Sequence, residues 1–100
     1  MRLTEFQRTK IVDAIIGQFG LDTEIYLFGS RVDDSKKGGD IDLLVAVHDE
    51  SDDIFLKKIK AVTAIQLAIG DQKIDLIVTP DISHDSRLVV SEAFRTGVRL

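Results

Sequence analysis

The sequence alternates between segments with helical periodicity and short apolar runs with strand character. Three runs are typical of strands: Glu24–Phe28, Ile41–Val47 and Lys73–Val78, the last closed by Pro80. The loop between the first two is too short for a helical crossover, so these strands can pair as antiparallel neighbours. Within 100 residues this alternation predicts a single α/β (α+β) domain over residues 1–100. We expect the order α-β-β-α-β-α, with helices packed against a small mixed sheet of three or more strands.

The first helix is predicted over Glu5–Phe19. Thr4 can cap it, and Gln7 three residues later completes a capping box. Gly20 can supply the left-handed residue that ends it. Its apolar residues share one helical face, which we expect to be buried: Val12, Ile15, Ile16 and Phe19.

Two further helices are predicted in the second half of the chain. One starts at Ser51–Asp53, with a cap and two acids in its first turn, and ends at Ile69 before Gly70. Its inward-facing residues are expected to be Phe55, Ile59, Val62, Ile65 and Ile69. Its solvent-facing lysines are expected to be Lys57, Lys58 and Lys60. The last helix begins at Ser83 or Asp85, stops near Gly97, and carries Leu88, Val89, Ala93 and Phe94.

Composition excludes several classes of protein. Thirteen Lys and Arg against 17 Asp and Glu give a net charge of −4, which disfavours a general nucleic-acid coat protein because such a protein needs a basic face. The absence of cysteine excludes disulfides, thiolate zinc sites and a cysteine nucleophile. The longest apolar run, Leu43–Val47, is far too short to span a membrane, and the polar N-terminal residues do not resemble a signal peptide. We expect a soluble, cytoplasmic protein without a membrane partner.

Three aspartates stand out because of their places in the strands. Asp40 and Asp42 begin the second strand, and because alternate residues point the same way, they share a face about 7 Å apart. Ile41 and Leu43 then point to the opposite face and can enter the core. Asp75 interrupts the apolar third strand, where a carboxylate costs desolvation energy unless it is paired or bound to a metal. If the second and third strands are neighbours, Asp75 lies beside the other two acids.

Converging carboxylates of this kind have a chemical consequence. They repel one another, so without a cation at least one should have a raised pKa. A hard divalent ion removes the penalty, and Mg²⁺ prefers a few carboxylates together with phosphate oxygens. Two such ions can hold the attacking and leaving oxygens of an in-line displacement at phosphorus. The acids therefore point to metal-dependent chemistry on a phosphate ester.

Gly29 and Ser30, at the end of the first strand, suit phosphate binding. Glycine lets the backbone come close to a phosphate, neighbouring amides can donate to its oxygens, and Ser30 adds a hydroxyl donor. The guanidinium of Arg31 beside them suits phosphate oxygens or, equally, a structural pairing with a nearby Asp. A Gly-Ser pair alone is usually only a turn, and an Asp-x-Asp pair alone is usually a solvated strand edge. Their combination with Asp75, in this order and on these elements, is much more specific.

Other interpretations fit the residues less well. A calcium-binding loop from Asp33 would put Lys37 at a ligand position and Leu44 where a glutamate is required. A nucleotide-binding P-loop would need Gly-Lys-Ser or Gly-Lys-Thr, and the sequence has neither. A phosphatase with an aspartate nucleophile would carry Asp-x-Asp after a hydrophobic strand, whereas here the strand follows. We expect Lys36 and Lys37 to lie in a solvated loop. We expect that neither His48 nor His84 binds a metal.

Together these motifs resemble the signature of the DNA polymerase beta-like nucleotidyltransferase superfamily. The matching residues are Phe28-Gly29-Ser30-Arg31 and Asp40-Ile41-Asp42-Leu43-Leu44-Val45, with nine residues between Ser30 and Asp40. More narrowly, the chain resembles the minimal nucleotidyltransferases (MNT proteins) of bacteria and archaea, although their antitoxin group frequently has one residue more in this spacing. Asp75 matches the third acid of the family, and Arg95–Leu100 is similar to the tail that often ends these domains. The resemblance covers nearly the whole chain.

What the resemblance implies is nucleotidyl transfer. A nucleoside triphosphate, expected to be ATP, would bind together with two Mg²⁺. Its phosphates would be held by the turn after the first strand: Gly29, Ser30 and Arg31. Asp40 and Asp42 would ligate both metals, and Asp75 would complete the catalytic metal site and help to activate an acceptor hydroxyl. That hydroxyl would attack the α-phosphorus, and pyrophosphate would leave.

The resemblance also implies a partner. Many MNT proteins are antitoxins of a small helical HEPN protein, an RNase-type toxin, and some of them adenylylate a tyrosine on it. The chain would then be a protein adenylyltransferase or, as the alternative, a non-catalytic antitoxin that neutralises its partner by masking it. The presence of all three acids together with Ser30 favours the enzyme. We expect the acceptor to be held by the partner, by a second copy of the chain in a homo-oligomer, or by the target itself.

Overall fold

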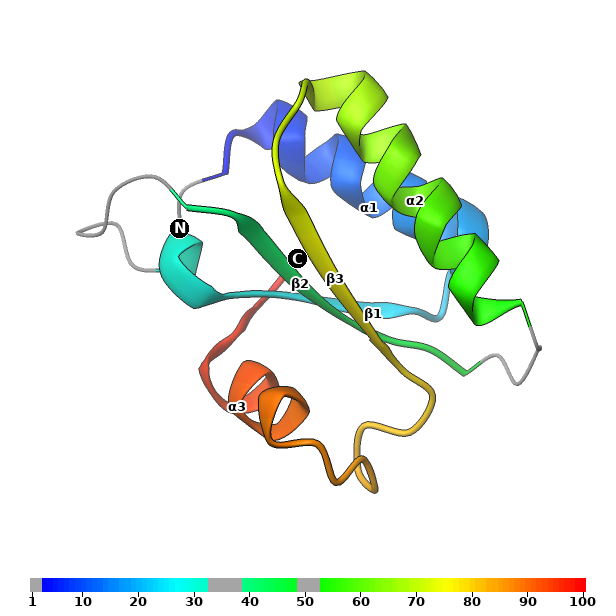
Figure 1. Cartoon of the computed structure of the whole chain (residues 1–100), viewed down its shortest axis with the longest axis vertical. Helices are drawn as coiled ribbons and strands as arrows, with labels where there is room; N and C mark the ends of the chain where they lie inside the picture. Colours follow the sequence, from blue (N-terminus) through cyan, green and yellow to red (C-terminus); the bar gives the residue numbers. More distant parts are fainter. Residues whose placement is uncertain (1–2, 33–38, 49–52) are drawn as a thin grey trace.

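The computed structural model of the chain describes residues 3–32, 39–48 and 53–100. The described elements are α1 (Glu5–Phe19), β1 (Glu24–Phe28), the 3₁₀ helix η1 (Gly29–Val32), β2 (Ile41–Ala46), α2 (Ile54–Ile69), β3 (Ile74–Thr79), α3 (Leu88–Thr96) and β4 (Val98–Arg99). The strands form a mixed sheet in the order β3-β2-β1-β4 (Figure 1). The predicted α/β architecture is therefore confirmed. None of the described helices combines the length and hydropathy of a membrane span.

Strand directions in the sheet follow from the connections. β1 lies antiparallel to both β2 and β4, whereas β2 and β3 are parallel. The predicted antiparallel pairing of the first two strands is thus confirmed. The chain between β2 and β3 contains α2, the kind of crossover that parallel neighbours need.

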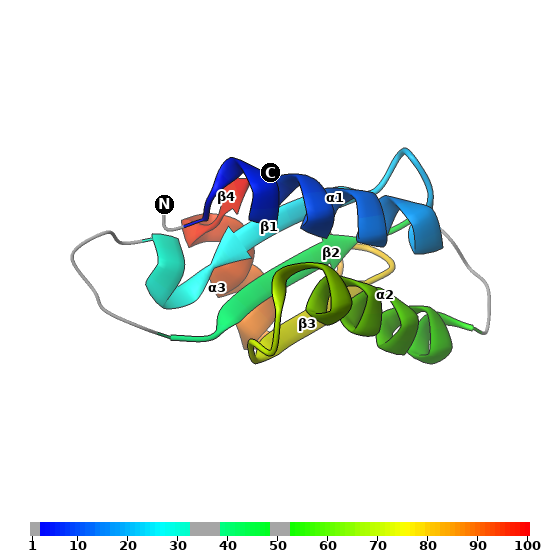
Figure 2. The same ribbon diagram turned by 90° about the horizontal axis from the view of Figure 1, so that it is seen from above.

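Helices cover the two faces of the sheet unequally. α1 and α2 lie side by side on one face, and the shorter α3 lies on the other (Figure 1 and Figure 2). The larger core is on the side of α1 and α2: Ile11, Ile15, Phe19, Ile25, Leu27, Ile41, Leu43, Val45, Val47, Ala61, Ile65 and Leu76. The smaller core is on the side of α3: Tyr26, Leu44, Val90 and Ala93. The more lightly covered α3 face carries the acidic residues of β2 and β3.

α1 has the predicted bounds and caps. Thr4 Oγ1 accepts a hydrogen bond from Gln7 N–H, and Gln7 Oε1 accepts one from Thr4 N–H, both at 3.0 Å. Gly20 follows the helix with a φ of 106°, so the predicted positive-φ ending is confirmed. The buried residues of α1 are Ile11, Ile15 and Phe19. Val12 and Ile16 are only partly buried.

α2 starts later than predicted. Its first residue is Ile54, and the side chain of the preceding Asp53 makes no capping hydrogen bond. The first turn therefore holds no acid, contrary to the prediction. Ser51 and Asp52, on which the predicted cap depended, lie outside the described residues.

The rotation of α2 about its axis also differs from the prediction. Phe55 and Ile59 were expected in the core but are 73% and 46% exposed, while Ala61 and Ile65 are fully buried. The apolar arc of this helix is wider than the strip that the sheet covers, because α2 lies above β3 at the edge of the sheet (Figure 2). Lys58, expected in solvent, is half-buried.

The C-terminal third contains two corrections to element bounds. β3 runs one residue later than predicted, and α3 starts at Leu88 rather than at Ser83 or Asp85. Asp85 instead accepts hydrogen bonds from Arg87, at 3.0 Å from Nε and 2.7 Å from Nη2. Arg87 Nη2 also donates to Val78 O at 2.9 Å and so joins the end of β3 to the start of α3. These side-chain hydrogen bonds fix Asp85 and Arg87 before the start of α3, whereas helical periodicity alone assigned both residues to the helix.

Two further differences concern α3 and the chain after it. Val90 and Ala93 are the buried residues of α3, whereas Leu88 is 77% exposed and Phe94 stacks edge-on against Tyr26. β4 was not predicted, since two residues carry no periodicity. Its pairing with β1 is continued by a hydrogen bond from Leu100 N–H to Ile25 O, at 2.9 Å.

Candidate active site

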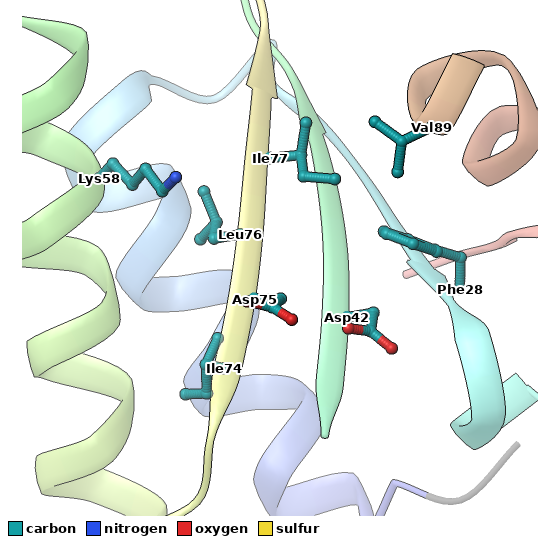
Figure 3. Close-up of a pocket in the computed structure, with 8 residues that line it drawn as sticks. All are labelled: Phe28, Asp42, Lys58, Ile74, Asp75, Leu76, Ile77 and Val89. Carbon is teal, nitrogen blue, oxygen red and sulfur yellow. The ribbon is translucent and has the colours of Figure 1, made fainter. Parts of the chain in front are cut away.

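Asp42 and Asp75 are neighbours on the α3 side of the sheet. The parallel register pairs them directly, and the antiparallel register of β1 and β2 pairs Asp42 with Phe28. The two carboxylates lie on the same side of their strands (Figure 3). Ile41 and Leu43 are fully buried on the other side, so the predicted division of β2 into an acidic face and a core face is confirmed. The catalytic and metal-binding roles of the acids stay predictions.

The surroundings of Asp42 raise its pKa. Desolvation by burial is the largest cause, followed by the negative charges of Asp75 and Asp40 and by a hydrogen bond with Asp75. Lys73 acts in the opposite direction. The expected raised pKa among converging acids is therefore confirmed. A proton or a cation placed between these carboxylates relieves the repulsion.

Asp40 lies two residues before Asp42 and has a different partner. Its Oδ2 is 3.4 Å from Lys73 Nζ, and both side chains are well exposed. Among the described residues, no three Asp, Glu or His side chains lie close enough to hold a metal ion together. The structure thus brings two of the three predicted acids together and leaves the third beside a lysine. Two carboxylates still suit Mg²⁺, which usually takes one or two and completes its shell with phosphate oxygens and water.

Gly29 packs directly against the acid pair. Its φ is 77°, and a Cβ added to it would overlap Asp42 Oδ2 and lie 3.1 Å from Asp42 Cγ. A side chain at this position would therefore displace the carboxylate, and glycine alone lets the turn come so close. Ser30 continues into η1, but its side chain lies outside the described part of the structure, as do Lys36 and Lys37. The turn expected to hold phosphate thus adjoins the acids expected to hold metal.

Arg31 ties this turn to the starts of both acid-bearing strands. Its Nη2 donates to Gln72 Oε1 at 2.9 Å, just before β3, and its Nε donates to Gly39 O at 3.4 Å, just before β2. Gln72 O in turn accepts from Gln66 Nε2 of α2 at 3.0 Å. The described contacts of Arg31, with Gln72 and with the backbone of Gly39, are structural. Nucleotide binding by Arg31 stays a prediction.

A cavity of about 300 Å³ opens around the acid pair (Figure 3). Its lining comes from β1, β2, β3 and both flanking helices: Phe28, Asp42, Lys58, Ile74, Asp75, Leu76, Ile77 and Val89. Lys58 reaches from α2 toward β3, and Val89 projects from α3 on the opposite side (Figure 3). The cavity therefore continues around the edge of the sheet, from the acids on one side to a lysine on the other.

Six residues of this cavity were not among the predicted site residues: Phe28, Lys58, Ile74, Leu76, Ile77 and Val89. Strand alternation could have found Ile77, which lies two residues after Asp75 and shares its face, and Phe28, which directly precedes Gly29. No local signal marks Lys58 or Val89, because their positions depend on how α2 and α3 pack on the sheet. The two histidines lie elsewhere: His48 is exposed, and His84 Nδ1 is 2.8 Å from Asp81 Oδ2.

A comparison of the sequence with protein families identifies the superfamily of the chain. The nucleotidyltransferase domain family matches residues 9–97. The chain belongs to this family. The matched region contains the turn at Gly29 and all three acids, so the superfamily resemblance is confirmed and nucleotidyl transfer is the activity indicated. No curated protein matches the chain.

Proposed function

We propose that this nucleotidyltransferase-family chain transfers AMP from ATP, with Mg²⁺, to a hydroxyl group of a helical HEPN-type partner, and so acts as the antitoxin of a toxin–antitoxin pair. One observation carries the catalytic part: the register that sets Asp42 beside Asp75, against the positive-φ turn at Gly29. Such a site gains from a cation between the carboxylates and from a polyphosphate at the turn. The resemblance to MNT proteins supports the choice of partner.

Each binding role falls to a particular residue. Asp42 and Asp75 would hold Mg²⁺, and Asp40 would join them by leaving Lys73. When bound, Mg²⁺ neutralises phosphate charge around the reacting phosphorus. The backbone at Gly29 and the hydroxyl of Ser30 would hold the outer phosphates. Burial, and after it the negative charges of Asp75 and Asp40, raise the pKa of Asp42, and these carboxylates supply the negative charge that makes the cation favourable.

The transfer itself is a displacement at the α-phosphorus. The acceptor oxygen forms a bond to phosphorus while the bond from phosphorus to the bridging oxygen of pyrophosphate breaks. The hydroxyl proton passes to the Asp75 carboxylate and then to water, and pyrophosphate leaves with the electron pair of the broken bond. The contribution of the chain is to position the groups and to neutralise charge.

Label transfer from α-labelled ATP to the purified helical partner, in Mg²⁺, tests this function. Asp42→Asn and Asp75→Asn should each lower the rate by on the order of 100-fold or more, because each removes a group that acts in the transition state. Asp13→Asn is the matched control, since Asp13 is exposed on α1. Equal labelling by wild type and both site variants would remove the acids from the mechanism.

A non-catalytic antitoxin is the second candidate. It is favoured by exposed apolar side chains on α2, a surface that a masking partner could cover: Phe55, Leu56, Ile59 and Leu67. If Asp42→Asn and Asp75→Asn still neutralise the partner fully, and do so without ATP, masking is the function. If neutralisation requires ATP and both acids, nucleotidyl transfer is the function.

A further inference from the structure

The acidic face of the sheet carries a fourth charged side chain, that of Lys73. Lys73 directly precedes β3, and its backbone C=O accepts a hydrogen bond from Ile41 N–H at 3.0 Å. Ile41 pairs with Ile74 in the parallel register, so the preceding residues, Asp40 and Lys73, lie opposite each other. Because alternate side chains share a face, Lys73 is on the same side of the sheet as Asp75.

Lys73 acts as a counter-ion to these acids. Its Nζ is 3.4 Å from Asp40 Oδ2, and its positive charge also opposes the rise in the pKa of Asp42. Together with Asp75, these residues contribute three carboxyl groups and one ammonium group to the face. An ammonium beside Asp40 competes with a metal ion for the same carboxylate, because both are cations. In the structure, Asp40 is accordingly paired with lysine and stays apart from the acid pair.

The backbone at Lys73 is held firmly, whereas its side chain can move. The preceding Gln72 accepts hydrogen bonds from Gln66 Nε2 at its backbone O and from Arg31 Nη2 at its side-chain Oε1. The side chain of Lys73 is 71% exposed, and that of Asp40 is 42% exposed. Ion pairs this exposed contribute little stability, because water competes for both charges. The ammonium can therefore change partners at low cost and without movement of the backbone.

A bound nucleotide would offer Lys73 a second anionic partner. Phe28 and Asp75 both pair with Asp42, so β1 and β3 flank β2 and lie about 10 Å apart across two strand spacings. The turn at Gly29 follows β1, so phosphates held between this turn and the acids would lie between β1 and the start of β3. A triphosphate carries several negative charges, and the flexible side chain of lysine is a common ligand for phosphate. It therefore attracts the ammonium more strongly than one exposed carboxylate does.

We propose that Lys73 exchanges partners when a nucleotide binds: its ammonium leaves Asp40 for a phosphate oxygen, and Asp40 then becomes available to the metal ion. The inference rests on the proposed function for the nucleotide and the metal. Lys73 is a positioning residue in this account, because it acts on the metal through Asp40. The exchange makes nucleotide and metal favour each other, since linkage between two ligands is reciprocal.

Binding of Mn²⁺ alone, measured by electron paramagnetic resonance without nucleotide, tests the competition for Asp40. Mn²⁺ is a suitable probe because, like Mg²⁺, it prefers carboxylate and water ligands. Lys73→Gln should bind Mn²⁺ about threefold more tightly than the wild type, whereas Lys73→Arg, which keeps the charge, should bind it like the wild type. Lys60→Gln, exposed on α2, is the control and should change little. Equal Mn²⁺ affinity in Lys73→Gln and the wild type would overturn the proposal.

A double-variant cycle separates the pairing with Asp40 from a general effect of charge. If Lys73 acts through Asp40, Lys73→Gln should tighten Mn²⁺ binding in the wild-type background but not in the background of Asp40→Asn. A general effect of the positive charge would tighten Mn²⁺ binding equally in both backgrounds, and that result would overturn the exchange. Thermal unfolding checks that each variant folds, which the exposure of both side chains favours.

Binding of ATP alone, measured by calorimetry in EDTA, tests the second partner of Lys73. Lys73→Gln should weaken metal-free ATP binding about fivefold, whereas Lys73→Arg and the control Lys60→Gln should not. Asp40→Asn should tighten metal-free ATP binding, because it releases the ammonium before the nucleotide arrives. This gain should be absent when Lys73→Gln is also present. Unchanged ATP affinity in Lys73→Gln would show that the ammonium does not move to the phosphates, and would overturn the exchange.

These measurements separate the inference from the proposed function. Mn²⁺ binding and ATP binding are each measured without label transfer, so both can follow the expected pattern even if no label reaches the partner; the exchange then stands while the transfer fails. If label transfer requires Asp42 and Asp75 but Lys73→Gln changes neither binding measurement, the transfer stands and the exchange is overturned. A wild-type chain that binds neither Mn²⁺ nor ATP would overturn both.

Discussion

The carboxylate of Asp42 occupies the space that a side chain on Gly29 would need. A Cβ on Gly29 would overlap Asp42 Oδ2, and Asp42 is paired in register with Phe28, the residue just before that glycine. The end of β1 and the acid on β2 are therefore built as one unit. A phosphate held at the turn would lie close to the acid pair without further movement of the backbone.

Replacement of Gly29 by alanine should therefore impair activity more than stability alone explains. We expect Gly29→Ala to lower label transfer by on the order of 100-fold, because the new Cβ displaces the carboxylate. Gly70→Ala is a matched control: Gly70 has a φ of 99°, but nothing lies within 4 Å of an added Cβ. Both variants should lose roughly 1–3 kcal/mol of stability to backbone strain. A similar activity for the two variants, measured at a temperature where both are folded, would contradict this account.

The raised pKa of Asp42 predicts how stability depends on pH. In the unfolded chain this carboxyl loses its proton around its ordinary pKa of 3.8, whereas the folded chain retains the proton to a higher pH. The folded state therefore binds more protons in this interval, and stability falls as pH rises from 3.8 through the folded pKa. Asp42→Asn should raise the Tm at neutral pH, and the difference should shrink below pH 3.8. Thermal unfolding across this range measures it, with Asp13→Asn as the unaffected control.

The binding of Mg²⁺ and ATP should reverse the order of Tm between the wild type and Asp42→Asn. A ligand that binds only the folded chain raises its stability, and it should do so for the wild type but much less for Asp42→Asn, which has lost a ligand to the cation. The wild type should then have a higher Tm in Mg²⁺–ATP than without them, while the variant should change little. An equal rise for both proteins would show that Asp42 does not hold the cation.

Strand alternation was the most reliable guide to the fold. A period of two assigns Asp40 and Asp42 to one face and Ile41 and Leu43 to the other without any knowledge of neighbouring strands, and burial confirms this division. The face of α2 that packs against the sheet could not be predicted from the sequence in the same way. Its apolar arc includes both Phe55 and Ile65, and only the position of the edge of the sheet decides which part is covered.

The contacts between single side chains of the candidate site could likewise not be predicted from the sequence. The sequence indicated three acids on one face, but the pairing of Asp42 with Asp75, and the ion pair of Asp40 with Lys73, depend on the register between β2 and β3. Register is a long-range property that periodicity does not specify. The contact of Gly29 with Asp42 likewise depends on the pairing of β1 with β2.

The ion pair of Asp85 and Arg87 should contribute stability that acid removes. Hydrogen bonds from the guanidinium and the backbone N–H of Arg87 hold the pKa of Asp85 well below its usual range. This contribution is fully present above 3.8, the ordinary pKa, and is lost as pH falls toward the folded value. Asp85→Asn should therefore be less stable than wild type at neutral pH, with a smaller difference in strong acid. Urea unfolding tests this against Arg95→Gln, which breaks the exposed pair with Glu92 and should change little.

Arg31 and Gln72 should act as one structural unit. Arg31 Nη2 donates to Gln72 Oε1 at 2.9 Å, so removal of either partner breaks the same bond. Gln72→Ala should cost about 1 kcal/mol in urea unfolding, Arg31→Ala should cost more because its Nε also donates to Gly39 O, and the double variant should cost little more than Arg31→Ala alone. If this bond is the main role of Arg31, Gln72→Ala should also raise the KM for ATP as much as Arg31→Ala does, because both release the turn at Gly29. A KM that rises only with Arg31→Ala would instead assign the guanidinium directly to the nucleotide phosphates.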